Sequence, residues 1–189
     1  MTDSGKKRGR LFIVSGPSGS GKTTLCAAWL EQTPNLLLSV SCTTRPPRAG
    51  DIDGRDYHFL GLDEFETRKQ AGEFLECAFV HGNWYGTRES DVEAMLKAGS
   101  NVLLEIDWQG AAQVAEKLPE ACRIFILPPS LDVLRARLVA RGLDDPPVIE
   151  RRLNAAEAEM AHAKEAKCRI ENEVFDDALA ELLAIYRAG

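Results

Sequence analysis

The sequence lacks the features that mark membrane-spanning, exported and nucleic-acid-binding proteins. None of its apolar runs approaches the roughly 18 residues that a membrane span needs, so we expect no contact with a membrane. The apolar stretch after the polar N-terminus is too short for the core of a signal peptide, which favours a cytoplasmic protein. A net charge of −6 argues against a general affinity for nucleic acid.

Cysteine and histidine are few and scattered along the chain. The five cysteines are an odd number without a C-x-x-C pair, and the three histidines show no paired ligand spacing. We therefore expect reduced, mostly buried thiols, and neither a disulfide framework nor a zinc site.

A stretch with three closely spaced glycines stands out near the N-terminus. The stretch fits the phosphate-loop pattern G-x-x-x-x-G-K-[ST] at every fixed position, and it reads Gly16-Pro17-Ser18-Gly19-Ser20-Gly21-Lys22-Thr23. The apolar run before it predicts a buried strand, and the apolar spacing after it predicts a helix. Backbone N–H groups then converge on a phosphate. We expect Lys22 to reach the β- and γ-phosphates of a nucleoside triphosphate, and the Thr23 hydroxyl to bind Mg²⁺.

Short apolar runs alternate with helical patterns along the rest of the chain. This alternation predicts an α/β fold with a five-stranded parallel sheet flanked by helices, as in P-loop NTPases. We interpret residues 1–189 as a single domain with a core at 10–41, 99–140 and 150–189, an insertion at 42–98, and a short lid at 141–149. Within the insertion we expect loop structure over 41–61, a strand over 72–80 and a turn over 81–84.

Charged residues mark two further places. The apolar run at 101–107 ends in the carboxylates of Glu105 and Asp107, where a Walker B acid would face the Mg²⁺ of the phosphate loop. Arginines cluster around residues 45–55 and again at 135–152. A solvated surface position is the simplest interpretation of any single arginine, but two clusters in an acidic chain indicate anion sites, because the guanidinium group binds phosphate bidentately.

Residues 41–59, SCTTRPPRAGDIDGRDYHF, resemble the signature of the guanylate kinase family. The resemblance continues through residues 82–87, 105–110 and 137–142 to Asn172, and covers the chain from Arg10 onward. It implies an inserted subdomain for the nucleoside monophosphate and Mg²⁺-dependent phosphoryl transfer from ATP to GMP, giving ADP and GDP. We expect dGMP to be accepted as well.

The resemblance also implies roles for individual residues. The base of the acceptor GMP would be read by Ser41, Glu76 and Thr87, and its phosphate would be bound by Arg45, Arg48, Tyr57 and Tyr85, with Glu105 and Asp107 close to the nucleotide. ATP would be bound by Gly16, Pro17, Ser18, Gly19, Ser20, Gly21, Lys22, Thr23, Thr24 and Asn172, of which Asn172 resembles the family's adenine contact. The catalytic residues would be Lys22, Arg45, Arg137, Arg141 and Arg152, and Mg²⁺ would be bound by Thr23, with Asp107 reaching it through a water.

The chemistry of guanine supports this assignment. A carboxylate such as that of Glu76 accepts the N1–H and N2–H₂ donors of guanine side by side, and adenine does not offer that pair. Two alternatives stay open: a kinase for another nucleoside monophosphate, and a non-catalytic guanylate-kinase-like module that binds phosphorylated peptides. The sequence also leaves open the oligomeric state and whether Glu105 or Asp107 is the Mg²⁺-linked acid.

Overall fold

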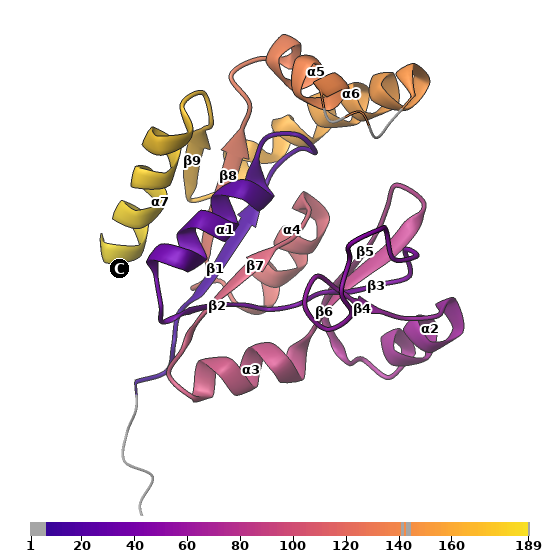
Figure 1. The fold of residues 1–189 in the computed structure, drawn as a ribbon. Coiled ribbons are helices and arrows are strands. Elements are labelled where there is room, and N and C mark those ends of the chain that lie inside the picture. The colour runs from indigo at the N-terminus through magenta and orange to yellow at the C-terminus, as the bar shows by residue number, and fades with distance from the viewer. Residues whose placement is uncertain (1–6, 141, 143–144, 189) are drawn as a thin grey trace, which may run out of the picture. The chain divides into compact units, whose positions relative to one another are not determined.

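A computed structural model of the chain describes residues 7–140, 142 and 145–188 (Figure 1). Its larger sheet has five strands in the order β2-β7-β1-β8-β9, and both β2–β7 and β8–β9 pair in parallel. The five strands are β1 (Leu11–Ser15), β2 (Leu36–Leu38), β7 (Asn101–Glu105), β8 (Cys122–Leu127) and β9 (Cys168–Glu171). The α/β fold with a five-stranded parallel sheet that the sequence predicts is confirmed.

The helices that accompany this sheet follow the alternation expected from the sequence. They are α1 (Lys22–Gln32), α3 (Glu89–Lys97), α4 (Trp108–Lys117), α5 (Leu131–Ala140), α6 (Pro146–Met160) and α7 (Phe175–Ala188), with a short 3₁₀ turn η1 (Ala161–Glu165). Strand β1 is buried along its whole length and apolar up to its last residue, Ser15, as expected when helices cover both faces of a sheet. Among the described residues, no helix is long and apolar enough to cross a membrane.

The chain divides into two compact units. One comprises Asn35–Leu104 and Gln109–Ala121 together with the N-terminal residues up to Phe12. The other comprises Ile13–Pro34, Glu105–Trp108 and the residues from Cys122 onward. We call them the acceptor unit and the phosphate-loop unit, after the predicted site residues that they contain.

The acceptor unit contains a second sheet that the sequence does not reveal. Its strand order is β4-β3-β6-β5, and the helix α2 (Leu62–Gln70) precedes β5. The four strands are β3 (Cys42–Thr43), β4 (His58–Phe59), β5 (Phe74–Val80) and β6 (Asn83–Arg88). The expectation of loop structure over 41–61 is therefore wrong for β3 and β4, which are too short to show an alternating pattern.

The hairpin between β5 and β6 is tighter than the sequence predicts. His81 and Gly82 both have positive φ, 49° and 85°, and Asn83 already pairs with Val80. Two left-handed residues form a two-residue hairpin turn that matches the twist of the strands. The turn expected over 81–84 is thus confined to its first two residues, and the last two begin β6.

An aromatic core holds the small sheet and α2 together. Phe65 of α2 is fully buried and stacks on Phe74 of β5, with ring centroids 4.6 Å apart. Gly86 of β6 lies beneath them, where a Cβ atom would come within 3.1 Å of both rings. A side chain at position 86 would have to displace these rings by a few tenths of an ångström, so the close packing favours glycine in this strand.

The phosphate-loop unit has its own apolar cluster, which packs α5 against α6. The cluster consists of Leu134, Leu138, Ile149, Leu153 and Ala156. Helix α6 begins at Pro146, with proline in its first turn, so the last residues of the expected lid belong to this helix. Arg141, Leu143 and Asp144 of that lid lie outside the described residues.

Candidate active site

The backbone of the phosphate loop depends on two of its glycines. Gly16 has a φ of 140°, and a Cβ atom there would lie 2.2 Å from the Ile126 carbonyl oxygen. Gly21 has a φ of 93°, and a Cβ atom there would lie 2.2 Å from the Asn172 side-chain nitrogen. The loop is therefore packed closely against the ends of β8 and β9, in a conformation that only glycine adopts without strain.

Lys22 folds back over this loop. Its ammonium group donates hydrogen bonds to the carbonyl oxygens of Gly16 at 2.5 Å and Pro17 at 2.9 Å. Burial lowers the pKa of Lys22, while the negative charge of Glu105 opposes that shift. The ammonium group thus lies over the loop that is predicted to hold the phosphates, and a phosphate oxygen would be a stronger partner than these carbonyls.

The Thr23 hydroxyl donates a hydrogen bond to Glu105 Oε1 at 2.6 Å. A hydroxyl and a carboxylate side by side are the hard oxygen donors that Mg²⁺ prefers, and Mg²⁺ in kinases takes one or two such groups besides phosphates and waters. Asp107 lies two residues further along, and its charge acts on both Lys22 and Glu159. In the described part of the chain, no group of three acidic, histidine or cysteine side chains could hold a metal ion.

Three of the predicted ATP-end residues contact the phosphate loop directly. Arg137 donates hydrogen bonds to the carbonyl oxygens of Asn172 at 2.8 Å and Ser20 at 3.4 Å. Arg152 lies 3.4 Å from the Ser18 hydroxyl. The buried Asn172 amide donates to the Ser20 carbonyl oxygen at 2.7 Å, so it supports the loop in addition to its predicted adenine contact.

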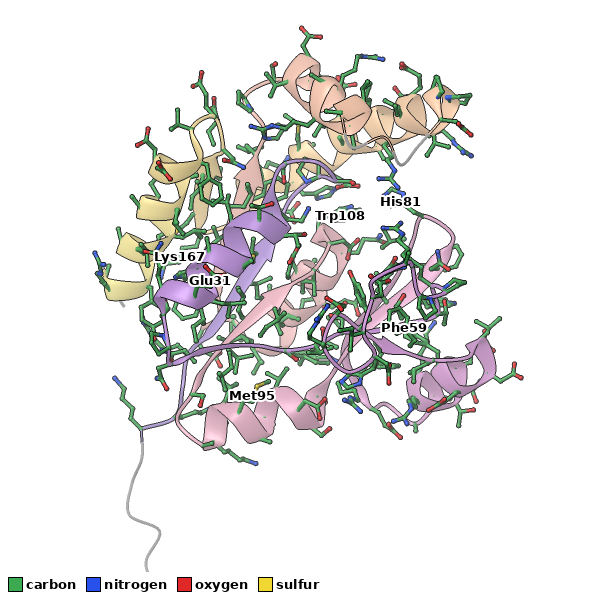
Figure 2. All side chains as sticks on the ribbon, in the orientation of Figure 1. Glu31, Phe59, His81, Met95, Trp108 and Lys167 are labelled. Atoms are coloured by element: carbon green, nitrogen blue, oxygen red, sulfur yellow. The ribbon has the colours of Figure 1, made fainter. Side chains whose placement is uncertain are left out.

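Buried charge extends beyond these residues to Glu159 on α6. Burial raises the pKa of Glu159, Lys22 lowers it and Asp107 raises it further. Three residues after Glu159, His162 stacks on Trp108, the first residue of α4, labelled in Figure 2, with ring centroids 3.7 Å apart. The sequence gives no signal for this carboxylate, because an isolated glutamate on a helix is usually solvated.

In the acceptor unit, Arg45 is held in place from several sides. Its guanidinium group is 2.8 Å from Asp51 Oδ2 and lies over the Tyr57 ring, 5.3 Å from its centroid. Burial lowers the pKa of Arg45, but the hydrogen bond and charge of Asp51 outweigh it, and the net shift is upward. Tyr85 meets Tyr57 edge-on at 5.8 Å. Three of the four predicted phosphate ligands are thus adjacent.

The fourth predicted phosphate ligand, Arg48, is exposed, and its backbone N–H donates to Asp51 at 2.8 Å. This backbone hydrogen bond and the Arg45 guanidinium hold the pKa of Asp51 below its ordinary value. Asp51 organises both arginines, and the sequence reasoning did not single it out. The signal was present, because this acid, three residues after the second arginine, belongs to the same motif.

A buried polar row crosses the small sheet. Glu76, only 3% exposed, accepts a hydrogen bond from the fully buried Thr87 hydroxyl at 2.6 Å. Glu76 pairs with Thr87 across β5 and β6, and β3 pairs Cys42 with Gly86. One residue further along that register places Ser41 opposite Thr87. The three predicted base-reading residues therefore occupy neighbouring register positions.

Comparison with known proteins gives one consistent result. The sequence model described as guanylate kinase matches residues 8–188. A guanylate kinase of Ralstonia nicotianae is 56% identical over 96% of this chain and 82% of its own, and one of Paraburkholderia xenovorans is 54% identical over 95% and 80%. The solved guanylate kinase of Anaplasma phagocytophilum is 34% identical, with a TM-score of 0.81 over 97% of this chain and 87% of that structure.

Proposed function

This chain belongs to the guanylate kinase family, and on that premise we propose that it transfers the γ-phosphoryl group of ATP to GMP, giving ADP and GDP. The observation that carries this proposal is the buried Glu76–Thr87 pair, in a chain whose phosphate loop is intact. A carboxylate is costly to bury unless it is hydrogen-bonded, and we infer that the donors of the acceptor base share Glu76 with Thr87.

Guanine fits this pocket because it offers two adjacent donors to one carboxylate. Glu76 accepts N1–H and N2–H₂, and the Thr87 hydroxyl, which already donates to Glu76 at 2.6 Å, keeps the carboxylate in orientation. Ser41 completes the row. A base without both donors makes fewer hydrogen bonds with the carboxylate, and sites of this kind reject such analogues by about 10⁴–10⁵.

The phosphate of GMP binds to the arginine and tyrosine group of the same unit. Arg45 and Arg48 supply guanidinium forks, and Tyr57 and Tyr85 supply hydroxyl groups. Because Asp51 and the Tyr57 ring already position Arg45, little conformational entropy is lost when the phosphate arrives.

At the ATP end, the phosphate loop and Lys22 hold the β- and γ-phosphates. Thr23 and Glu105 would hold Mg²⁺, which when bound neutralises charge on those phosphates, and Asp107 stays a prediction as a water-linked partner. Arg137 and Arg152 are anchored on the loop, and Arg141 is predicted to join them at the transferring group.

The reaction requires alignment more than side-chain chemistry. An oxygen of the GMP phosphate forms the new bond to the γ-phosphorus, and the bond from that phosphorus to the bridging oxygen of ADP breaks. The attacking oxygen is already anionic, so no general base is needed. The arginines and Lys22 stabilise charge on the equatorial oxygens, and the loop fixes the leaving group.

Coupled ADP release with ATP–Mg²⁺ and GMP, AMP, dTMP or CMP in turn tests this function. We expect fast turnover with GMP alone, and a loss of at least about a hundredfold in kcat/KM for GMP in Glu76→Gln, since truncating a buried charged partner costs about 2–5 kcal/mol. Turnover with another nucleotide would mean that the pocket reads a different base. ATP binding without any turnover would favour the phosphopeptide-binding alternative.

A further inference from the structure

The strand that carries Glu76 contains an irregularity on which the position of this residue depends. Phe74 pairs with Arg88, and Glu76 pairs with Thr87, so Leu75 is an additional residue in β5. In regular pairing, Leu75 would stand opposite Thr87 and Glu76 would turn to the other face of the sheet, because side chains alternate. This β-bulge therefore brings the carboxylate to the Thr87 hydroxyl.

Strand β5 is the last strand of the small sheet, and within the described ranges no strand pairs with its outer side. The side chains of α4 take that place. The Gln113 amide accepts a hydrogen bond from the Cys77 N–H at 3.1 Å and donates one to the Cys77 carbonyl at 2.9 Å. A single side chain thus satisfies both backbone groups of one residue, as a neighbouring strand would.

Lys117, one helical turn further, holds the bulge itself. Its ammonium group donates to the Leu75 carbonyl at 2.6 Å and to the Phe74 carbonyl at 3.3 Å. These are charge-assisted hydrogen bonds to the additional residue and to the one before it. Gln113 and Lys117 therefore form hydrogen bonds with the backbone on both sides of Glu76.

The spacing of the two side chains matches the spacing of their targets. Four residues along a helix advance by about 6 Å. Two residues along a strand, from Leu75 to Cys77, advance by about 6.6 Å. Both contacts therefore require a helix that lies along β5. One of its side chains must both donate and accept a hydrogen bond, and the side chain four residues later must be long and positively charged.

We propose that Gln113 and Lys117 are positioning residues for guanine specificity, which hold the β5 bulge so that the Glu76 carboxylate stays aimed at the acceptor base. This inference rests on the proposed function. The simpler explanation is that α4 only covers an exposed sheet edge. The two explanations differ in what they predict for GMP, because protection of an edge affects stability and leaves base selection unchanged.

The experiment uses Gln113→Leu and Lys117→Met, with Lys117→Arg as the conservative replacement. Glu116→Met is the matched control, since Glu116 is an exposed neighbour of Lys117 on the same helix. For each of the two disruptive variants we expect KM for GMP to rise about tenfold, which corresponds to the loss of the hydrogen bonds from one side chain. The kcat at saturating GMP and the KM for ATP should stay within about twofold of the wild type, because no donor-site contact is lost.

Base discrimination gives a second readout. Inosine monophosphate lacks the N2 amino group, so the preference for GMP over it measures how well Glu76 is aimed. We expect this preference to fall about tenfold in the two variants, to return in Lys117→Arg, and to be unchanged in Glu116→Met.

The inference is overturned if Gln113→Leu and Lys117→Met leave both KM for GMP and the preference for GMP over inosine monophosphate unchanged. It is also overturned if Glu116→Met changes these two quantities as much as they do. If Gln113→Leu does not fold, Lys117→Met alone tests the inference, because Lys117 is an exposed residue. A wild-type protein without GMP turnover would instead refute the proposed function, and the inference with it.

Discussion

The phosphate loop and the acceptor pocket are built in different ways. In the phosphate loop, consecutive residues from Gly16 to Thr23 supply the backbone and side-chain groups that are expected to bind phosphate. In the acceptor unit, Glu76 and Thr87 come from different strands and meet only because a bulge and a tight hairpin set their register. Backbone conformation therefore determines the first site, and tertiary contacts determine the second.

This difference predicts how each site fails. A loop that depends on the conformation of single glycines should be lost through one added methyl group. A pocket whose side chains are held by neighbours should lose affinity gradually as those neighbours are removed. The following substitutions test this comparison, beginning with the largest expected effect.

Gly21 and Gly50 form a matched pair for the first test, because their φ angles are 93° and 92°. A Cβ atom on Gly21 would lie 2.2 Å from the Asn172 side chain, whereas one on Gly50 would meet nothing within 4 Å. We expect Gly50→Ala to lower the free energy of unfolding by about 1–2 kcal/mol through backbone strain alone. Gly21→Ala should cost more and reduce kcat/KM for ATP by about a hundredfold, since displacement by an ångström disrupts alignment.

Urea unfolding and ATP-dependence of the rate measure both effects. Suppose that Gly21→Ala and Gly50→Ala lower the free energy of unfolding and kcat/KM for ATP equally. That result would show that backbone strain, and not the contact with Asn172, explains the need for glycine at position 21. The phosphate loop would then depend less on its surroundings than the structure indicates.

The second test concerns Mg²⁺ at the phosphate loop. Glu105 accepts the Thr23 hydroxyl at 2.6 Å, so Glu105→Gln keeps a hydrogen-bonding group there and removes the charge. We expect the Mg²⁺ concentration for half-maximal rate to rise at least about tenfold. Asp107→Asn is the comparison, and a larger rise in that variant would identify Asp107 as the Mg²⁺-linked acid.

The sequence predicts the phosphate-loop unit better than the acceptor unit, for a physical reason. Parallel strands such as β1 and β8 contain short apolar runs, at residues 11–14 and 124–127, and a phosphate loop is a contiguous motif. Strands β3 and β4 have two residues each, and β6 contains Gly86, whose absent side chain makes room for Phe65 and Phe74. No local pattern predicts such strands, because their pairing partners and their packing are distant in sequence.

The same contrast holds for the site residues. Resemblance to a family predicts Arg45, Glu76 and Thr87, because these residues stand within recognisable motifs. It does not predict the side chains that hold them, such as Gln113 and Lys117, since a glutamine and a lysine on a helix are usually solvated. Residues that act through another residue become visible only when the backbone that they hold is known.

A third test asks whether Asp51 preorganises Arg45 for the GMP phosphate or competes with that phosphate for Arg45. Asp51 bonds both Arg45 and the backbone N–H of Arg48. If Asp51 preorganises Arg45, Asp51→Asn should raise KM for GMP about two- to tenfold, since ordering one long side chain costs about 0.5–1.5 kcal/mol. A lower KM would show instead that the Asp51 carboxylate competes with the phosphate.

Asp56 supplies the control for that test. It bonds the backbone N–H of Ile52 and the guanidinium group of Arg55, so it makes the same pair of contacts in the same segment without touching a predicted ligand. We expect Asp56→Asn to leave KM for GMP within about twofold of the wild type.

The smallest effect is expected where an ion pair lies away from both sites. The hydrogen bond from Arg8, followed by that from Lys97, lowers the pKa of Glu93 from 4.5 to about 2. A carboxyl group whose pKa is lower in the folded state stabilises the fold above its unfolded pKa, and this contribution is lost as pH falls from about 4.5 towards 2. The urea midpoint of the wild type should therefore approach that of Glu93→Gln as pH falls from about 5 to 3.

Exposed Glu31 on α1 provides the control for Glu93, as Glu31→Gln. If the urea midpoints of the wild type and Glu93→Gln differ by the same amount at every pH, the ion pair with Arg8 adds nothing to stability through charge. In either case kcat and KM should not change, because Glu93 and Arg8 touch no predicted ligand. An ion pair would then matter for catalysis only where, as at Asp51, it positions a group that meets the substrate.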